Sequence, residues 1–337
     1  MSAPRLIDLH CDWLLQYACE TTVFDPAIYA GVQQRLSQAV GYLQGTSAAV
    51  LSCYRRVEDW KSQADPWYAL IELIARYEAE FPGRLLIGPD DFRRWQEEPE
   101  GLCWGILGIE GFDFLIRESD DLGRLPQLFD RGVRVFQPVY SADNRLAGSS
   151  EIGDSRGLTE LGLAFLETLA DLPGGPRPAL DLAHMNPTSI SETLDWFESM
   201  PSRADRLIPV FSHGSIAHED FQSPRALRLE SLARLRALGG VVGFSVGPPF
   251  YSSSRMLKSE INAAASFPFQ GRMGVEGLAF GTDFLGVDRT LSGLGNVEEL
   301  LAWIGETFPP EIVEAITQNN AMSLVRRLTG SLVIGGA

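Results

Sequence analysis

The sequence has few cysteines, few basic residues and no long apolar run, and each of these scarcities excludes a class of protein. Cysteine accounts for 4 of 337 residues, with neither CxxC spacing nor the density of a disulfide scaffold, so we expect reduced thiols and no metal site built on cysteine. No apolar run reaches transmembrane length, and no secretory signal precedes the first strand-like run at about Leu6. These features predict a soluble, cytoplasmic protein with no membrane partner.

Basic residues are also scarce. Lys and Arg together number 28 against 44 Asp and Glu, which gives a net charge of −16 at pH 7. This excess of negative charge would repel a phosphate backbone unless a local basic stripe compensated for it. The sequence contains no such stripe, so we expect no nucleic-acid partner.

Apolar residues, at 45%, are plentiful enough for a large core. Short β-branched or apolar runs alternate with longer helical patterns, which is typical of parallel βαβ units. Eight runs have the pattern of strands: residues 5–13, 47–54, 103–111, 133–141, 178–185, 207–215, 239–247 and 277–286. Residues 84–88 are a weaker ninth candidate. Apolar spacing near 3.6 predicts helices at residues 66–81, 158–172, 189–200 and 227–238.

Eight such units with no linker between them predict one (β/α)8 TIM barrel spanning residues 1–337. Two irregular stretches, residues 143–157 and 247–271, each follow a predicted strand. In a barrel they would lie over the end of the strands where this fold carries its active sites.

Polar side chains recur where the predicted strands end: His10, Asp12, Glu110, Tyr140, His184, His213 and Asp283. In a parallel barrel these ends meet at one mouth, so the side chains should converge there. Residues i and i+2 of a strand share a face, which lets His10 and Asp12 point into the mouth together. Imidazole and carboxylate suit Zn²⁺, and three histidines with three carboxylates exceed the needs of one tetrahedral ion. Two ions that share a bridging carboxylate would use them all.

Each of these residues also has a structural role open to it. A histidine near a strand end is commonly a hydrogen-bonded structural residue, Glu110 could be a turn residue, and Asp283 could cap the next helix. We interpret His218, in the loop after the sixth strand, as a structural residue and not as a ligand. We interpret Asp8 in the same way, because we expect it on the same strand face as His10 but one step deeper in the barrel. The joint placement of three histidines and three acids at strand ends is harder to explain structurally.

Several motifs occur in a fixed order: "IDLHCDW", "GIEG", "GLTELG" leading to "LDLAHM", "PVFSHGS", "SPRAL", "GGVVGFS" and "FGTDFLG". This ordered set resembles the membrane dipeptidase (renal dipeptidase) family of zinc peptidases, within the amidohydrolase superfamily. The resemblance extends from about residue 5 to "ITQNNAMSLVRRL", which is similar to that family's closing helix.

The resemblance implies a role for each matching metal ligand. His10 and Asp12 match the pair on the first zinc, and Glu110 matches the bridging carboxylate. His184 and His213 match the two histidines of the second zinc. The implied cofactor is therefore two Zn²⁺ ions per chain.

Further roles follow from the same resemblance. Asp283 matches the aspartate beside the first metal that handles protons, and Arg225 matches the arginine that holds the substrate's terminal carboxylate, a task suited to a guanidinium fork. Tyr140 falls where mammalian members carry a histidine near the scissile carbonyl. Stabilisation of the transition state then falls to Tyr140, to Asn144 or to the metals. Leu285 replaces an acid of the family's pattern.

The implied activity is hydrolysis of dipeptides, including L-Xaa-D-Yaa dipeptides, by a hydroxide held between the two metals. A homodimer is expected by analogy with relatives. Two alternatives stay open: a related amidohydrolase acting on N-acyl amino acids or another amide, and a catalytically inactive metal-binding homologue. Asp12 in place of the second histidine of an H-x-H pair, and Glu110 in place of a bridging lysine, favour the dipeptidase.

Overall fold

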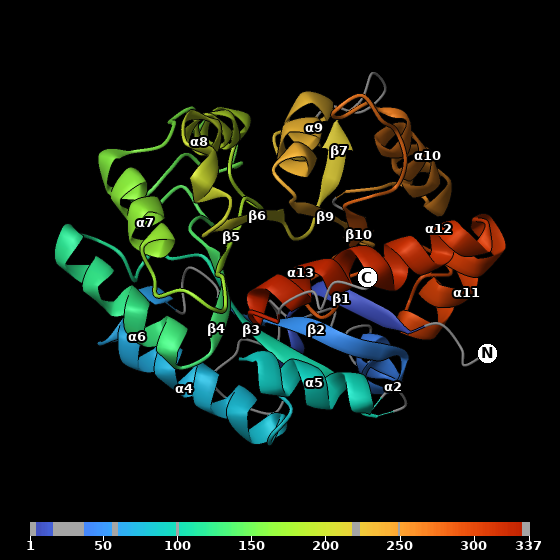
Figure 1. Ribbon diagram of the computed structural model, residues 1–337, viewed down its shortest axis with the longest axis horizontal. Coiled ribbons are helices and arrows are strands. Elements are labelled where there is room, and N and C mark those ends of the chain that lie inside the picture. The colour runs from blue at the N-terminus through green and yellow to red at the C-terminus, as the bar shows by residue number, and fades with distance from the viewer. Residues whose placement is uncertain are drawn as a thin grey trace, which may run out of the picture.

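The computed structural model describes residues 5–15, 37–55, 60–98, 101–217, 223–248 and 250–331. A closed barrel of parallel strands, in the order β1-β10-β9-β6-β5-β4-β3-β2, confirms the predicted (β/α)8 fold (Figure 1). Its strands are β1 (Leu6–Cys11), β2 (Thr46–Cys53), β3 (Trp104–Glu110), β4 (Val133–Gln137), β5 (Ala179–Asp181), β6 (Ile208–Phe211), β9 (Val241–Phe244) and β10 (Leu278–Phe280). All eight predicted strands are present. The weaker candidate at 84–88 contributes only an isolated bridge from Leu85 to Gly105.

The four predicted helices are confirmed as α4 (Pro66–Glu80), α7 (Glu160–Ala170), α8 (Pro187–Ser199) and α9 (Leu229–Ala237). The other helical segments are α2 (Tyr42–Gly45), α5 (Pro89–Glu97), η2 (Ser119–Arg124), α6 (Leu125–Asp130), η3 (Pro201–Arg203), α10 (Ser254–Ser266), α11 (Val297–Thr307), α12 (Pro310–Glu314), η4 (Ala315–Asn319) and α13 (Asn320–Leu328). Local sequence sets where they begin. Asn186 caps α8 by accepting a hydrogen bond from the Ser189 amide at 2.8 Å, just before a proline in the first helical position.

Two features differ from the prediction. The stretch 247–271 contains α10, capped by Ser253, although we expected it to be irregular. The structure also contains a small parallel sheet of β7 (Ser215–Ala217) and β8 (Ala226–Arg228) that was not predicted. Strands of three residues are too short to show the alternation by which a strand is recognised in a sequence. The stretch 143–157 lacks helix and strand, as expected.

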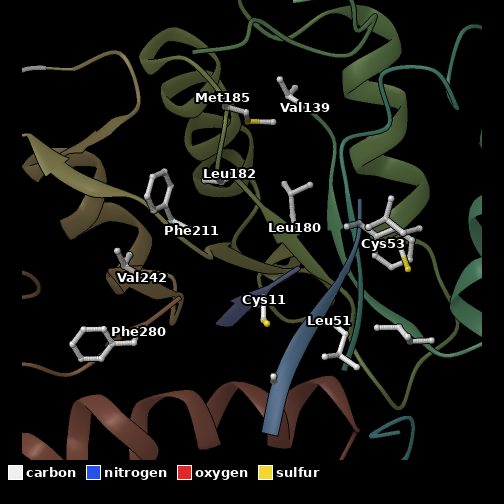
Figure 2. Packing of buried hydrophobic residues seen from close by; sticks show 14 of the residues in the cluster. Cys11, Leu51, Cys53, Val139, Leu180, Leu182, Met185, Phe211, Val242 and Phe280 are labelled. Atoms are coloured by element: carbon white, nitrogen blue, oxygen red, sulfur yellow. The ribbon is translucent and has the colours of Figure 1, made fainter. Parts of the chain in front are cut away.

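The core has two layers. The outer layer lies between the strands and the surrounding helices, and Figure 2 shows Leu51, Leu180 and Phe280 of this layer on their strands. The inner layer fills the barrel with small and branched side chains such as Ile7 and Val50. At the N-terminal end of the barrel, α13 adds its apolar face to this inner layer: Ala321, Leu324, Val325 and Leu328.

An irregularity in β1 corrects the predicted face of Asp8. Asp8 and Cys11 are three positions apart along β1, whereas their partners Ala49 and Leu51 on β2 are only two positions apart. The extra residue is a β-bulge, and it reverses which alternate side chains face inward. Asp8 therefore lies on the outer face of the barrel, opposite to the prediction, and His10 turns inward beyond the bulge.

Three of the four cysteines, Cys11, Cys53 and Cys103, are buried free thiols in the described chain. Burial raises the pKa of Cys103 to about 12. Cys19 and His218 lie outside the described residues. Among the helices that the structure describes, none is both long enough and apolar enough to span a bilayer.

Candidate active site

The predicted ligands meet at the C-terminal mouth of the barrel. Glu110 is the last residue of β3, and the others follow within three residues of their strands or lie at the end of β1. Two groups have ligand atoms within 4.8 Å of one another: His10, Glu110 and His213, and His10, Asp12 and Asp283. Side chains up to 273 positions apart in the sequence thus form one buried cluster.

Glu110 stands at the centre of this cluster. Its Oε2 lies 3.4 Å from His10 Nε2, and its Oε1 lies 3.3 Å from His184 Nε2 and 3.9 Å from His213 Nε2. Ser52, on the neighbouring strand, donates a hydrogen bond to Oε2 at 2.9 Å. The two carboxylate oxygens therefore face two different sets of imidazoles.

The two histidines on the Oε1 side face each other. His184 Nε2 and His213 Nε2 are 3.1 Å apart, and the Ser212 hydroxyl lies 2.9 Å from His213 Nδ1. Burial and, to a smaller extent, the charge of nearby Arg225 lower the pKa of His184 to about 4. Burial, together with the charge of His10, also holds the pKa of His213 well below its usual range. Both rings are thereby kept neutral, which is the form that ligates metals.

The other side of the cluster is dominated by carboxylates. His10 Nε2 lies 3.7 Å from Asp12 Oδ2. Burial alone would lower the pKa of His10, but the charges of Glu110 and Asp12 outweigh burial and raise it. Burial raises the pKa of Asp283 to about 8. These shifts mean that the acids on this side cannot all be ionised without a counter-charge, which His10 supplies in part and a bound cation would supply in full.

Backbone geometry supports these positions. His184 and Asp283 adopt φ angles of 65° and 59°, in the left-handed region that non-glycine residues rarely enter. Such conformations concentrate at functional sites, where the surrounding structure compensates for the strain. A Cβ on Gly286 would overlap the carboxylates of Asp12 and Asp283, so only glycine leaves the space that they occupy.

The donor set fits metal ions. His10 Nε2 is buried without a hydrogen-bond partner, although it points at two carboxylates. A buried imidazole nitrogen in that position is satisfied by an ion. The six candidate ligands offer nitrogen and oxygen but no thiolate, which suits a borderline ion such as Zn²⁺.

Arg225 reaches the cluster from the residue before β8. Its Nη2 lies 3.1 Å from His184 Nε2, and its guanidinium carbon lies 4.7 Å from the centre of the Phe250 ring. The structure thus brings a cation that can bind a carboxylate next to the candidate metal ligands.

Tyr140 also lies at the cluster. Its ring stacks on His184 with ring centres 4.5 Å apart, and its hydroxyl accepts a hydrogen bond from the Tyr54 hydroxyl at 3.0 Å. Asp113 holds the loop in place, since its carboxylate accepts hydrogen bonds from the amides of Tyr140 at 3.0 Å and Ser141 at 2.7 Å.

Asn144 is placed differently. Its side chain donates to the Ser141 carbonyl and accepts from the amides of Leu146 at 2.9 Å and Ala147 at 3.0 Å. These bonds commit the amide to its own loop, so a direct role in substrate binding stays a prediction. Leu285, which replaces an acid of the family pattern, is fully buried in the outer core layer.

Sequence reasoning missed four supporting residues: Ser52, Tyr54, Asp113 and Gly286. Ser52 and Tyr54 had a signal, because they are polar residues at i and i+2 at the end of a predicted strand, as His10 and Asp12 are. Gly286 and Asp113 had none, since their importance depends on contacts between separate loops.

Comparisons with known proteins place the chain in a family. A family model described as membrane dipeptidase (peptidase family M19) matches residues 1–329. Two solved structures share the fold at 18% identity and a TM-score of 0.68. The first, the dipeptidase AC, a metallopeptidase of family M19, covers 98% of this chain and 100% of its own. The second, a metallopeptidase from Rhodobacter sphaeroides liganded with a phosphinate mimic of the dipeptide L-Ala-D-Ala, covers 97% and 100%.

A curated relative is less informative about activity. It is an uncharacterized protein in the pqqA 5′ region of Klebsiella pneumoniae, 26% identical over 217 residues, which cover 60% of this chain and 72% of that protein.

A (β/α)8 barrel with imidazoles and carboxylates clustered at its C-terminal mouth is an enzyme fold with a candidate metal site where this fold carries its active sites. The family model narrows this class, because it shows that the chain belongs to the membrane dipeptidase family. This membership makes it a hydrolase of the metallo-dipeptidase type and confirms the predicted enzyme class.

Proposed function

We propose that this chain is a two-zinc dipeptidase in which Glu110 bridges the ions. The observation that carries the proposal is the division of the Glu110 carboxylate, with Oε2 toward His10 and Oε1 toward His184 and His213. A carboxylate placed between two sets of imidazoles is what paired metals require.

The remaining ligands divide accordingly. His10 and Asp12 would hold one ion, with Asp283 beside it, and His184 and His213 would hold the other. When bound, the metals supply the positive charge that lowers the pKa of the water nucleophile and polarises the peptide carbonyl.

The side chains around the metals position the substrate. Arg225 binds the C-terminal carboxylate of the dipeptide through its guanidinium fork. Because Arg225 lies 3.1 Å from His184, it holds that carboxylate close to the bond to be cleaved. Longer peptides are disfavoured for the same reason, since their terminal carboxylate cannot reach Arg225 while an internal bond lies over the cluster.

Two further groups serve the reaction itself. The Asp283 carboxylate takes a proton from the attacking water and returns it to the departing amine, so that one residue acts first as base and then as acid. The Tyr140 hydroxyl accepts a hydrogen bond from the Tyr54 hydroxyl, so its own O–H is left to donate to the carbonyl oxygen of the substrate. Glu110 would fix the position of the His10 side of the site relative to the His184 and His213 side.

A D-residue at the second position is included in the proposed specificity. The Rhodobacter sphaeroides structure of the same fold holds a mimic of L-Ala-D-Ala, which supports testing this class of substrate.

A kinetic screen of the zinc-loaded protein tests the proposal. The panel contains L-Xaa-L-Yaa and L-Xaa-D-Yaa dipeptides, the matching dipeptide amides, tripeptides and N-acyl amino acids. We expect kcat/KM of at least about 10⁴ M⁻¹s⁻¹ for the preferred dipeptides and much lower values for their amides. Hydrolysis of N-acyl amino acids with inert dipeptides would instead assign the site to the related amidohydrolases, and a zinc-loaded protein inert toward the whole panel would indicate an inactive homologue.

A further inference from the structure

A cavity of about 650 Å³ lies at the end of the barrel opposite the candidate active site. Arg177, in its wall, comes two residues before β5, whereas His184 follows the other end of the same strand. The opposite wall is formed by α13, which closes the N-terminal end of the barrel. A molecule bound here would be separated from the candidate metal ligands by the core of the barrel.

The cavity gathers positive charge in an acidic protein. Arg177, Arg326 and Arg327 line it together with Ser323 and Ser331, and all three arginines are half-buried. Elsewhere in the described chain many arginines pair with Asp or Glu, among them Arg93, Arg94, Arg131, Arg156, Arg203, Arg206, Arg234 and Arg272. The three cavity arginines are not among them, although the chain carries a net charge of −16.

Arg177 and Arg327 direct their hydrogen bonds to main-chain oxygens, and the guanidinium carbon of Arg326 lies 5.6 Å from the centre of the Phe92 ring. Arg177 Nη1 donates to the Asp205 carbonyl at 3.1 Å, and Arg327 Nε donates to the Ser323 carbonyl at 3.2 Å. Burial and, to a smaller extent, the charge of Arg177 lower the pKa of Arg327 to about 10. The two cations are thus close enough to repel each other, and an anion between them would relieve that repulsion.

The helix dipole accounts for only part of this arrangement. Arg326 and Arg327 lie in the last turn of α13, where cations are favourable. However, their carbonyls already accept hydrogen bonds from the amides of Ser331 at 2.9 Å and Arg177 at 3.1 Å. Arg177 itself comes from a different segment, so the dipole does not explain why its side chain joins the other two.

We propose that this cavity is a binding site for a phosphate group, held by Arg177, Arg326 and Arg327. Guanidinium forks match the geometry of phosphate oxygens and stay charged at neutral pH. The two serine hydroxyls in the wall add neutral donors of the kind that phosphate accepts. The volume lies in the range of small-molecule sites, so it has room for a phosphorylated small molecule as well as for a free polyphosphate.

Isothermal titration calorimetry on the zinc-loaded full chain, at constant ionic strength, tests this proposal with pyrophosphate and AMP as probes. We expect saturable binding that weakens by about tenfold or more in Arg177→Gln and in Arg327→Gln. Arg272→Gln is the matched control, because it makes the same change in charge at an arginine paired with Glu276, and it should bind like the parent protein. Tighter binding of AMP identifies a phosphorylated small molecule as the ligand, and tighter binding of pyrophosphate identifies a polyphosphate.

Phosphate can also bind the active-site metals, and the variants separate the two sites. Binding at the metals would inhibit dipeptide hydrolysis competitively and would persist unchanged in both arginine variants, and that result would overturn the proposal. So would the absence of saturable binding at millimolar concentration. Arg177→Lys provides a second variant, which keeps the charge but loses the fork, and we expect it to bind with intermediate affinity.

Discussion

Asp8 and Thr282, 274 positions apart, are joined by two hydrogen bonds that connect the first barrel strand, β1, to the segment after the last one, β10, beneath the candidate metal site. Asp8 Oδ1 accepts from the Thr282 amide at 2.8 Å, and Oδ2 accepts from the Thr282 hydroxyl at 2.6 Å. The same carboxylate accepts from the Tyr42 hydroxyl at 2.8 Å and from the His10 amide at 3.2 Å. Because His10 and Asp283 adjoin these contacts, Asp8 sets the position of two candidate ligands without being one.

We predict that Asp8→Ala lowers the free energy of unfolding by about 3–5 kcal/mol, because it leaves buried donors without acceptors. Asp8→Asn should cost less, about 1–3 kcal/mol, because its Oδ1 can still accept from both amides and only the two hydroxyl donors lose their acceptor. Urea denaturation of the three proteins measures the difference. An Asp8→Ala protein as stable as the parent would contradict this role.

Glu110→Gln should reduce the zinc content from two ions per chain to at most one, because a neutral amide cannot bridge two cations. Plasma mass spectrometry on protein dialysed against buffered zinc measures the stoichiometry. Glu78→Gln is the matched control: Glu78 pairs with Arg131 at 2.9 Å, away from the strand ends, and its variant should retain both ions. Two tightly held ions in Glu110→Gln would remove the bridge from the scheme.

Arg225→Met should raise KM for dipeptides by about 10- to 100-fold with a much smaller change in kcat, because a charge-assisted contact to the substrate carboxylate is lost. The parent should discriminate strongly against dipeptide amides, and the variant should not. An unchanged KM, or discrimination retained in Arg225→Met, would place the carboxylate elsewhere.

Tyr140→Phe should lower kcat by about 10- to 100-fold, since it removes a hydroxyl donor but keeps the ring that stacks on His184. Tyr54→Phe should have a smaller effect in the same direction. If Tyr54 acts through Tyr140, the double variant should be no slower than Tyr140→Phe alone. Independent, additive losses in kcat would show that the two hydroxyls act separately.

The fold and the ligand cluster were predictable from the sequence for a common reason. Each barrel strand is an apolar run, so a histidine or acid at its end, such as Glu110 or His184, stands out against the residues before it. Convergence then follows from the topology, because parallel strands of a barrel end at one mouth.

Other features depend on contacts that a single sequence does not display. The bulge in β1 arises from its register against β2, so strand alternation placed Asp8 on the wrong face. Glycine is required at position 286 because of the carboxylates of Asp12 and Asp283, and Asp12 lies at the opposite end of the sequence, just after β1. The hydrogen bond from the Tyr140 amide to Asp113 likewise joins two separate loops. The cytoplasmic location, the homodimer and the single domain over residues 1–337 stay predictions.

Metal removal and reconstitution tests the central claim most directly. The protein is stripped with a chelator, Zn²⁺ is added back in measured equivalents, and hydrolysis of a good dipeptide substrate is followed at each step. We predict no turnover in the metal-free protein and a return of activity that saturates at two equivalents per chain. Turnover by a fully metal-free sample, or a full return of activity at one equivalent, would contradict a two-metal site bridged by Glu110.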